Sequence, residues 1–505
     1  MPPGGRFKGV WRAWQARAGG STEWDLGLLR TIGGWPAVAA LGVCAVGLWG
    51  WPFTVDDAFI VARYAAHVAA GHGYTMNVGD PPTDGVTGPA WVLVMMGGVG
   101  LAKGVGLGCA ALAAAVAVRW AGRAGGSAAA AASTAFLVAQ PTLGLWGVAG
   151  VETGAAALAL TVAATGTTCG RGIRVGLATA ALLWLRPEAV PAALVAVAAT
   201  GTRSRRAGAM AVGLTLVGAV GVLVFRWSLF GHPLPLALAA KPPDLAHGAA
   251  YAARAAVATT GLVALVPAAW GVLRGFPGAP AMAALVGVHV VAVVLAGGDW
   301  MPGYRLFAPV FPPLGILVGL GVARLPIRAG LRVVVLGACC VAPLLDTTAQ
   351  LPEARDAGRR REEVARPLAE WMGEQFQSVA LVDAGYLAWA SGVRVFDLAG
   401  LTDPTIARAP GGHLDKRFDP GLLAAAAPDA IVLHAARRPG VRDGRLVALA
   451  GYPVERRVAS HPWVRAHYRV TRVVRYAPGY WYVVLSGVRR RQSAVRWGAP
   501  LTADR

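Results

Sequence analysis

Long apolar segments fill the first two-thirds of the chain and predict a bundle of membrane-spanning helices. From about residue 33 to residue 346, runs rich in Ala, Val, Leu and Gly alternate with short polar or arginine-bearing breaks. About 20 apolar residues in a helix are enough to cross the hydrocarbon core of a bilayer. The predicted spans, about eleven in all, are 33–51, 105–120, 126–142, 150–168, 173–186, 188–202, 208–228, 257–274, 280–297, 305–323 and 330–346.

The pattern changes after residue 346, where the charge density rises and no apolar run is long enough to span a bilayer. Short apolar runs bounded by turn residues predict buried strands, and helices are predicted over 356–374 and 420–427. The predicted strands are Ser378–Val382, Val393–Asp397 and Ala430–His434. We therefore predict a mainly α polytopic membrane protein, with a membrane domain at 33–346 and a smaller C-terminal α/β domain at 347–505.

Composition supports a membrane environment for the first domain. Of the 505 residues, 55% are hydrophobic and only 14% are charged, whereas soluble domains carry about 25% charged residues. A water-soluble core cannot hide so much apolar surface. The five cysteines lie in or beside apolar segments without metal-ligand spacing, so we interpret them as small membrane-core residues.

The formal net charge is +21, and in the apolar part of the chain arginine clusters lie at the ends of apolar runs, as the positive-inside rule requires. No nucleic-acid-binding motif accompanies this charge. Five basic residues precede the first span, so residues 1–32 are predicted to be cytoplasmic, without a cleavable signal peptide. The other arginine-bearing breaks face the cytoplasm if residues 88–120 cross the membrane once, with Gly88–Leu101 lying along the interface. The C-terminal domain is then extracytoplasmic.

On this topology, ionisable residues from several separate segments gather on the outer face, beginning with the large first outer loop at 52–104. Such residues near membrane depth are costly and are usually functional. They are Asp56, Asp57, Glu152, Arg186, Glu188, Lys241, Asp299 and Arg305.

Two adjacent carboxylates, Asp56 and Asp57, follow directly on the first span. Helix capping requires only one of them, and neighbouring carboxylates raise each other's pKa by repulsion. This arrangement suits a general base or a metal ligand. The turn-rich sequence from Gly71 to Pro89 that follows is either a compact surface loop or a lid over a sugar site.

Six short motifs occur between residues 50 and 435, each weak by itself. They are Asp56–Ile60 with Arg63, Gly71–Gly73, Asn77 and Thr87–Trp91; Gly150–Thr153; Arg186–Glu188; Phe230–Pro235 with Lys241; Gly297–Arg305; and Asp397–Pro404. In this order they resemble the glycosyltransferase C superfamily, and most closely the branch that contains the terminal arabinofuranosyltransferases of mycobacterial cell walls. Leu236, where relatives often have Asn, and Asp84, where Glu is commoner, depart from the pattern.

The resemblance implies a glycosyltransferase of the bacterial cell (inner) membrane. Such an enzyme transfers a sugar, arabinofuranose in the named branch, from a polyprenyl-phosphate donor to a cell-envelope glycan on the outer face. It implies Asp56 as the general base of an inverting reaction and Asp57 as its supporting or substrate-positioning partner, although the reverse assignment stays open. Some superfamily members use a divalent cation, but no spacing here demands a metal or another cofactor.

The remaining site residues are predicted to bind substrate. Negative charge develops on the lipid-linked phosphate as it leaves, so cations should face it, and the candidates are Arg186, Lys241 and Arg305. Three acids either position sugar hydroxyls or hold these cations in place: Glu152, Glu188 and Asp299. The substrate-binding set is completed by Arg63, His72, Asn77 and Tyr304.

Two other classes of function are compatible with many spans. A transporter or flippase of lipid-linked sugars is disfavoured by acids confined to the outer face, because transporters bind near the midplane. An inactive relative or assembly scaffold is disfavoured by the intact Asp56-Asp57 pair. The expected partners are the lipid-linked donor, the glycan acceptor and the bilayer, with no nucleic acid.

Overall fold

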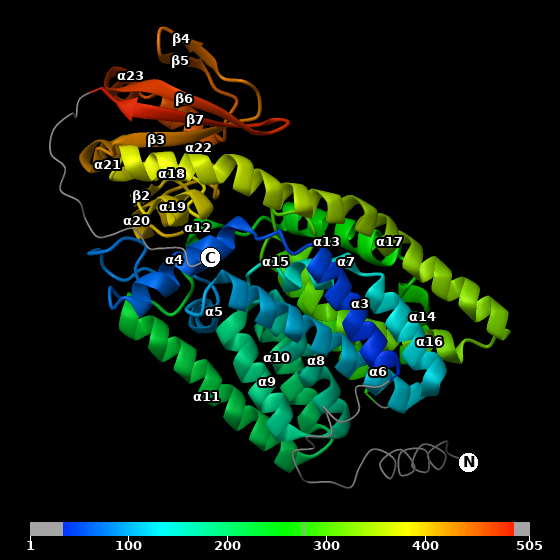
Figure 1. Cartoon of the computed structure of the whole chain (residues 1–505). Coiled ribbons are helices and arrows are strands. Elements are labelled where there is room, and N and C mark those ends of the chain that lie inside the picture. Colours follow the sequence, from blue (N-terminus) through cyan, green and yellow to red (C-terminus); the bar gives the residue numbers. More distant parts are fainter. Residues whose placement is uncertain (1–33, 275, 277, 489–505) are drawn as a thin grey trace, which may run out of the picture. The chain divides into compact units, whose positions relative to one another are not determined.

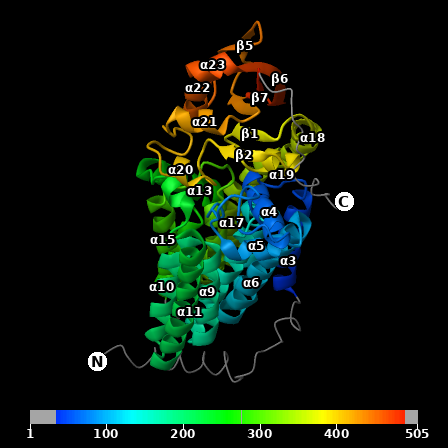
Figure 2. The same cartoon turned by 90° about the vertical axis from the view of Figure 1, so that its left-hand side faces the viewer.

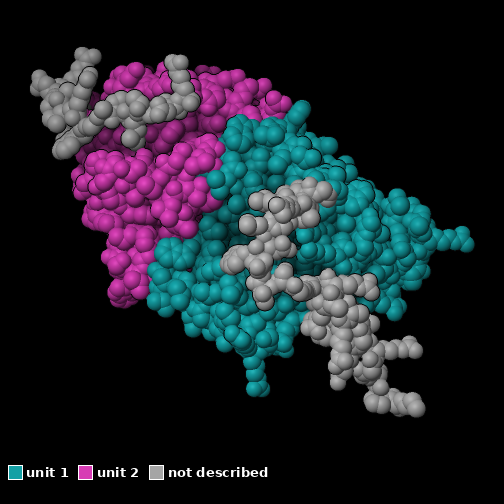
Figure 3. All heavy atoms as spheres, turned by 60° about the horizontal axis from the view of Figure 1, so that its bottom comes forward, with its two compact units in different colours: residues 1–51, 102–222, 244–354 teal, residues 52–101, 223–243, 355–505 magenta. Residues whose placement is uncertain are grey.

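The computed structural model describes residues 34–274, 276 and 278–488, which form two compact units (Figure 3). Unit 1 comprises Met1–Trp51, Ala102–Val222 and Asp244–Ala354. Unit 2 comprises Pro52–Leu101, Leu223–Pro243 and Arg355–Arg505. The predicted cytoplasmic segment 1–32 lies outside the described residues. Unit 2 brings the first outer loop together with the C-terminal domain.

Unit 1 is a bundle of apolar helices, and Figure 2 shows α9 and α10 running side by side. A helix satisfies its own backbone hydrogen bonds, which is what a lipid environment demands. The helices that lie wholly or mostly in unit 1 are α3 (Trp35–Trp49), α6 (Val99–Val138), α7 (Pro141–Gly147), α8 (Thr153–Cys169), α9 (Gly172–Leu185), η1 (Pro187–Ala189), α10 (Val190–Gly201), α11 (Arg205–Phe230), α13 (Leu245–Thr260), α14 (Leu265–Leu273), α15 (Ala279–Leu295), η2 (Arg305–Val310), α16 (Phe311–Arg324) and α17 (Ala329–Arg360).

Small residues let these helices approach backbone to backbone. A Cβ placed on Gly154 of α8 would lie 2.0 Å from the carbonyl oxygen of Gly106 on α6. A Cβ on Gly321 of α16 would lie 1.7 Å from the carbonyl oxygen of Pro267 on α14. Close contact through Gly and Ala is the usual way for helices to pack in membranes, because burial of apolar surface gains little there.

Four helical segments are long and apolar enough to cross a membrane: Val99–Val138, Arg205–Phe230, Arg305–Arg324 and Ala329–Gln375. The pair α13 and α14, bent by 89°, would make a fifth, and five further apolar helices have 10–17 residues. These helices indicate a membrane protein. The described residues contain fewer full-length spans than the eleven predicted.

Glycine marks two breaks in the apolar sequence. The spans predicted at 105–120 and 126–142 are two helices that meet inside α6 at Gly126, whose φ of 78° and ψ of −173° are not helical. The span predicted at 257–274 is interrupted after α13 by Gly261 (φ 57°). Glycine adopts positive φ without the clash that other residues suffer, so it can redirect a helix inside an apolar run. The interfacial helix predicted at Gly88–Leu101 appears as the short α5 (Pro89–Met95) in unit 2, with α6 beginning at Val99.

The C-terminal part of unit 2 is built on a five-stranded mixed sheet with the order β2-β1-β3-β7-β6. The three predicted strands appear as β1 (Ser378–Leu381), β2 (Arg394–Asp397) and β3 (Ala430–Ala435), which are parallel. The two long antiparallel strands β6 (Tyr468–Ala477) and β7 (Tyr480–Gly487) complete the sheet (Figure 1). Every residue of β3 is buried, as its continuous apolar sequence predicts for a central strand.

The other elements of unit 2 surround this sheet or belong to the first outer loop. They are α4 (Asp56–Ala69), α5, α12 (Leu236–Ala240), η3 (Arg361–Ala365), α18 (Arg366–Gln375), α19 (Tyr386–Ser391), α20 (Pro404–Ala407), α21 (Pro420–Ala426), the hairpin β4 (Gly440–Arg442) and β5 (Arg445–Ala448), α22 (Pro453–Ser460) and α23 (Pro462–His467). Helix α4 packs against α19, so the first loop and the C-terminal domain share one structure.

Asp84 in the first loop forms a buried ion pair with Arg226, whose Nη2 also donates to the carbonyl oxygen of Thr87 at 2.7 Å. Both side chains of the pair are almost fully buried. Removing one partner leaves the other charge buried and unpaired, so Asp84→Asn should lower the free energy of unfolding by about 3 kcal/mol. Denaturation of the detergent-solubilised protein measures this loss. Asp356→Asn, which breaks an exposed pair with Arg359, should cost less than about 1 kcal/mol; equal losses would contradict the prediction.

Candidate functional site

Asp56 and Asp57 form the first turn of α4 in unit 2, where the helix dipole favours negative charge. The residue that caps this helix is Val55, which has no side-chain capping bond. Asp56 instead uses its carboxylate across the fold, because its Oδ1 accepts a hydrogen bond from the backbone N–H of Tyr386 at 2.8 Å. The carboxylate is therefore held by the C-terminal domain rather than by its own helix.

The turn after β1 lies directly on this carboxylate. A Cβ placed on Gly385 would lie 2.1 Å from Oδ2 of Asp56 and 2.4 Å from its carbonyl oxygen. Only glycine fits at such a distance, so the absence of a side chain at Gly385 lets the turn reach Asp56. Asp383 belongs to the same turn, two residues before Gly385.

Asp383, which is partly exposed, begins a chain of acid and histidine side chains in unit 2. His434 Nε2 lies 2.9 Å from Oδ2 of Asp383, and His434 Nδ1 lies 2.6 Å from Oε1 of Glu455. The hydroxyl of Tyr480 donates to the same Asp383 oxygen at 2.9 Å. The rings of Tyr452, Tyr480 and Tyr482 surround the imidazole, with centroids 5.1–5.6 Å away. We call Asp383, His434 and Glu455 the acid–histidine array.

The members of the array shift one another's pKa values in opposite directions. His434 has a pKa well above its usual value, because the attraction of Asp383 and Glu455 outweighs the effect of burial. Burial would raise the pKa of Asp383, but the charge of His434 and the bonds from His434 and Tyr480 hold it below the usual value. At neutral pH, Asp383 is therefore a carboxylate beside an imidazolium.

The pKa of Asp56 is raised, whereas that of Asp383 is lowered. Burial, and then repulsion by Asp383 and Asp57, raises the pKa of Asp56 to about 7, against the opposing hydrogen bond from Tyr386 and attraction by His434. At a pH near its pKa, a carboxyl group is ionised in a large share of the molecules and is also basic enough to accept a proton. Such perturbed groups are concentrated at catalytic sites.

Lys241 and His413 are further charged or titratable groups of unit 2. Lys241 follows α12, and the buried Lys416 binds this helix by donating to the carbonyl oxygen of Ala239 at 3.4 Å. Burial first, and then the charge of Lys241, lowers the pKa of His413 to about 3, while Asp57 opposes the shift. Within the described part of the chain, Lys241 forms no ion pair with an acid.

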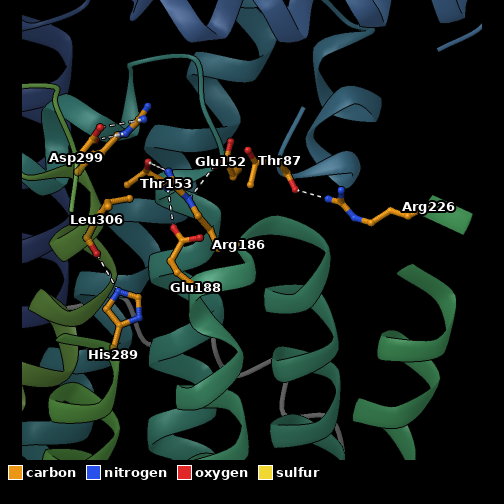
Figure 4. A network of polar contacts seen from close by, with 10 residues as sticks. Thr87, Glu152, Thr153, Arg186, Glu188, Arg226, His289, Asp299 and Leu306 are labelled. Atoms are coloured by element: carbon orange, nitrogen blue, oxygen red, sulfur yellow. Dashed lines mark hydrogen bonds and ion pairs between the residues drawn. The ribbon is translucent and has the colours of Figure 1, made fainter. Parts of the chain in front are cut away.

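Arg186 organises a separate buried network in unit 1 (Figure 4). It follows the end of α9 in an extended conformation, and Pro187 begins η1 immediately after it. Its guanidinium lies 2.8 Å from Glu152 Oε1 and 3.0 Å from Glu188 Oε1, and it donates to the hydroxyl of Thr153 at 2.8 Å. The two acids thus hold Arg186 in place, which is one of the two roles predicted for them.

Arg305 forms a further ion pair in unit 1, with its Nε 2.5 Å from Oδ2 of Asp299. Its guanidinium lies 5.6 Å from the ring centre of Trp146 and is close enough to Arg186 to repel it. Tyr304, just before it, has the left-handed φ of 53°. The two arginines are accompanied by three acids, so the formal charge of the cluster is negative. Such a cluster suits hydroxyl groups better than a phosphate.

Three of the predicted substrate-binding residues have other surroundings. Arg63 is buried and donates to the carbonyl oxygens of Met76, Ala388 and Val393. Asn77 bonds both the N–H and the C=O of Val395 on the edge strand β2. His72 is exposed, beside His67. In the structure, Arg63 and Asn77 join the first loop to the C-terminal sheet.

Four residues of unit 2 were not predicted from the sequence: Asp383, His413, His434 and Glu455. The sequence could have pointed to Asp383 and His434, because β1 and β3 were predicted as strands. Polar groups at the carboxyl ends of parallel strands commonly form sites. Asp383 lies just beyond β1, and His434 is the penultimate residue of β3. Neither Glu455 on α22 nor His413 in a loop had such a signal.

The acids of the described residues do not form an evident metal site. No group of three or more His, Cys, Asp or Glu side chains in that part of the chain is arranged to hold a metal ion.

Replacing Arg186 should destabilise unit 1 strongly. Arg186→Gln leaves two buried carboxylates without their shared cation, and breaking a buried pair in this way costs about 3 kcal/mol or more. Denaturation in detergent micelles measures the change in unfolding free energy. Arg206→Gln alters an exposed arginine of unit 1 and should cost less than about 0.5 kcal/mol. If Arg186→Gln leaves the unfolding free energy unchanged, the cluster contributes nothing to the stability of the fold.

Comparisons with known proteins find solved structures with a similar fold. A family model described as "Domain of unknown function (DUF8728)" matches residues 353–488. A comparison with curated proteins finds no match. ArnT from Cupriavidus metallidurans in the apo state aligns with a TM-score of 0.50 at 14% identity, covering 70% of this chain and 84% of ArnT. ArnT bound to undecaprenyl phosphate aligns with a TM-score of 0.58 at 14% identity, covering 90% and 97%.

At this identity the likeness establishes the fold. The fold of this chain is therefore similar to that of ArnT. The alignment with the undecaprenyl-phosphate complex extends over nearly the whole of both chains.

Proposed function

We propose that this protein is an inverting membrane glycosyltransferase with Asp56 as its general base. It moves a sugar from a polyprenyl-phosphate donor to a hydroxyl group of a cell-envelope glycan. The observation that carries the proposal is the environment of Asp56: a carboxyl group bonded to the N–H of Tyr386 at 2.8 Å, in contact with Gly385 and with a pKa near 7. The ArnT-like fold supports it, since one of the matching structures holds undecaprenyl phosphate.

In the proposed reaction, Asp56 removes the proton of the acceptor hydroxyl as its oxygen attacks the anomeric carbon. The bond between that carbon and the phosphate oxygen breaks, and its electron pair leaves with the lipid phosphate. Attack from the opposite face inverts the configuration at the anomeric carbon. A positioned base accelerates such a step by about 10²–10⁴-fold.

Lys241 is the cation that we assign to the departing phosphate. Its charge is not neutralised by an acid in the described residues, and a positive group aimed at developing negative charge stabilises the transition state. Asp57, which acts electrostatically on His413 together with Lys241, is assigned to positioning the acceptor. For the cluster around Arg186 and Arg305 we propose sugar hydroxyl groups as ligands, because its acids outnumber its arginines.

The finer identity of the substrates follows from the motif resemblance. We propose arabinofuranose as the first sugar to test and a cell-wall glycan as the acceptor. We also propose that the protein lies in the bacterial inner membrane, with a cytoplasmic N-terminus and with unit 2 on the outer face, where the arginine pattern leads us to expect the C-terminal domain.

One observation favours a transporter of lipid-linked sugars, namely the helix pair α13 and α14 with its bend of 89°. Transporters use such broken helices to form binding sites near the membrane midplane. The residues at this break, Gly261 to Ala264, carry no charge or side-chain hydrogen-bonding group. The ionisable groups lie elsewhere in the chain, so we favour the enzyme.

The transfer reaction tests the proposal directly. Purified full-length protein in lipid nanodiscs is incubated with polyprenyl-phosphate arabinofuranose, and with other polyprenyl-phosphate sugars, in the presence of a cell-wall glycan. We expect one donor to yield a glycosylated acceptor whose new bond has the inverted configuration by NMR. Retained configuration would contradict a single general base, and absence of product with every donor would contradict the enzyme.

A further inference from the structure

The acid–histidine array has no part in the reaction as proposed so far, yet two of its members, His434 and Glu455, are buried in unit 2. Glu455 is 0% exposed and accepts from both the backbone N–H and the ring of His434, at 2.8 and 2.6 Å. Burying ionisable groups together is costly unless each is paired. Every ring nitrogen of His434 is bonded to an acid, so the array is complete without an external ligand.

The array is connected to Asp56 through one short turn. Asp383 is its outermost member, and the turn from Asp383 to Tyr386 contacts Asp56 through Gly385 and through the N–H of Tyr386. The side chain of Asp383 is partly exposed, at 26%. The same few residues therefore hold the carboxylate of Asp56 and present a second carboxylate to it.

We propose that Asp383, His434 and Glu455 are positioning residues that fix the carboxyl group of Asp56 and determine whether it carries a proton. The proposal rests on the proposed function, in which Asp56 is the base. It extends that function by giving the C-terminal domain a direct part in controlling the base, rather than a role in binding the acceptor alone.

The sign of the control follows from the charges. One imidazolium lies between two carboxylates, so the array presents a net negative charge to Asp56. A negative neighbour disfavours the ionised form of a carboxyl group. Removing an acid from the array should therefore make Asp56 more acidic, whereas removing the imidazolium should make it less acidic.

Other groups also face Asp56 and must stay constant in a test. Arg361 of η3 contributes a cation beside Tyr386, with its guanidinium carbon 5.8 Å from the ring centre. The titratable groups that act on Asp56 or are acted on by it, besides the array, are Asp57 on α4, Tyr476 on β6 and Tyr482 on β7. None of them is altered in the variants below.

The test reads the ionisation of Asp56 itself in the full-length protein in lipid nanodiscs. Infrared difference spectra recorded across pH follow the C=O stretch of protonated carboxyl groups, and the band lost in Asp56→Asn identifies Asp56. We expect Asp383→Asn to move the midpoint of this band to lower pH and His434→Gln to move it to higher pH, each by on the order of one pH unit. A purely structural role would not produce opposite shifts.

Asp429→Asn is the matched control. Asp429 is also in the C-terminal domain and accepts hydrogen bonds from the backbone of Gln377 and Ser378 at the opposite end of β1. Its replacement disturbs the same strand without altering the array, so the midpoint should stay at the wild-type value.

The outcomes decide between the proposals. If Asp383→Asn leaves the midpoint unchanged or raises it, the array does not control Asp56 and the inference is overturned. The partly exposed Asp383 is the safer site, so the direction of its shift decides even if His434→Gln does not fold. Because the spectra record ionisation and not transfer, an inactive wild-type protein would contradict the proposed function without affecting this result.

Discussion

Asp56→Asn is expected to slow sugar transfer by about 10²–10⁴-fold, the usual contribution of a positioned general base. The amide has nearly the same shape as the carboxyl group and can still accept from the N–H of Tyr386, so the turn at Gly385 should keep its position. What it loses is the ability to take the proton of the acceptor hydroxyl. Single-turnover transfer from a labelled donor, at saturating acceptor, measures this rate.

Two other carboxylates of the same loop serve as controls. Asp57→Asn should reduce transfer less than Asp56→Asn and mainly raise the KM for the acceptor, because we assign Asp57 to positioning. Asp80→Asn, which affects an ion pair with the half-exposed Arg394, should stay close to the wild-type rate. A larger loss in Asp57→Asn than in Asp56→Asn would exchange the roles of the two residues.

The role of Asp56 as the base also predicts how the transfer rate of the wild-type enzyme depends on pH. Asp56 accepts a proton only when it is ionised, and its pKa is raised to about 7 by burial and by Asp383. The transfer rate should therefore fall as the pH drops below about 7, far above the ordinary range for an aspartate. A rate that stays constant down to the usual pKa of aspartate would contradict the assignment.

Lys241→Met is the second large effect, an expected loss of about 10²–10³-fold in kcat. Methionine keeps an unbranched apolar chain but removes the positive charge that we assign to the departing phosphate. Because this charge develops mainly in the transition state, kcat should fall more than the affinity for the donor. Lys241→Arg, which keeps the charge, should recover part of the rate. Steady-state kinetics with varied donor concentration separates kcat from KM.

The activity of Lys241→Met also tests whether Lys241 or the arginine cluster in unit 1 faces the departing phosphate. If Lys241→Met is fully active while conservative variants of Arg186 abolish transfer without unfolding the protein, the phosphate would belong to the arginine cluster instead. Arg186→Lys provides that comparison, because it keeps the charge between Glu152 and Glu188.

The parts of the fold that follow from local sequence were predictable. The strands β1, β2 and β3 are short apolar runs bounded by turn residues, and the structure contains them. The breaks in the membrane domain were predictable in part. The spans predicted at 105–120 and 126–142 are separate helices that meet at Gly126 inside α6, whereas the bend after Gly261, inside the span predicted at 257–274, was not predicted. Hydropathy does not reveal a bend that a single glycine introduces within an apolar run.

Only the first-loop residues of the candidate site were predictable from the sequence. Adjacent carboxylates at the start of a loop drew attention to Asp56 and Asp57 from sequence alone. Their partners Asp383, His434 and Glu455 lie more than 300 residues later, and only the folding of the first loop onto the C-terminal sheet brings them together. Arg63 and Asn77, predicted to bind substrate, instead bond backbone groups that make this association.

The most direct test of the account is the fate of the donor in sealed proteoliposomes that contain the full-length protein. The donor carries one label on its sugar and another on its lipid phosphate, and the acceptor glycan is present on one side. We predict that labelled sugar appears in the acceptor together with an equal amount of free polyprenyl phosphate. Movement of intact donor between the leaflets, with no cleavage of the sugar–phosphate bond, would contradict the enzyme and favour a transporter.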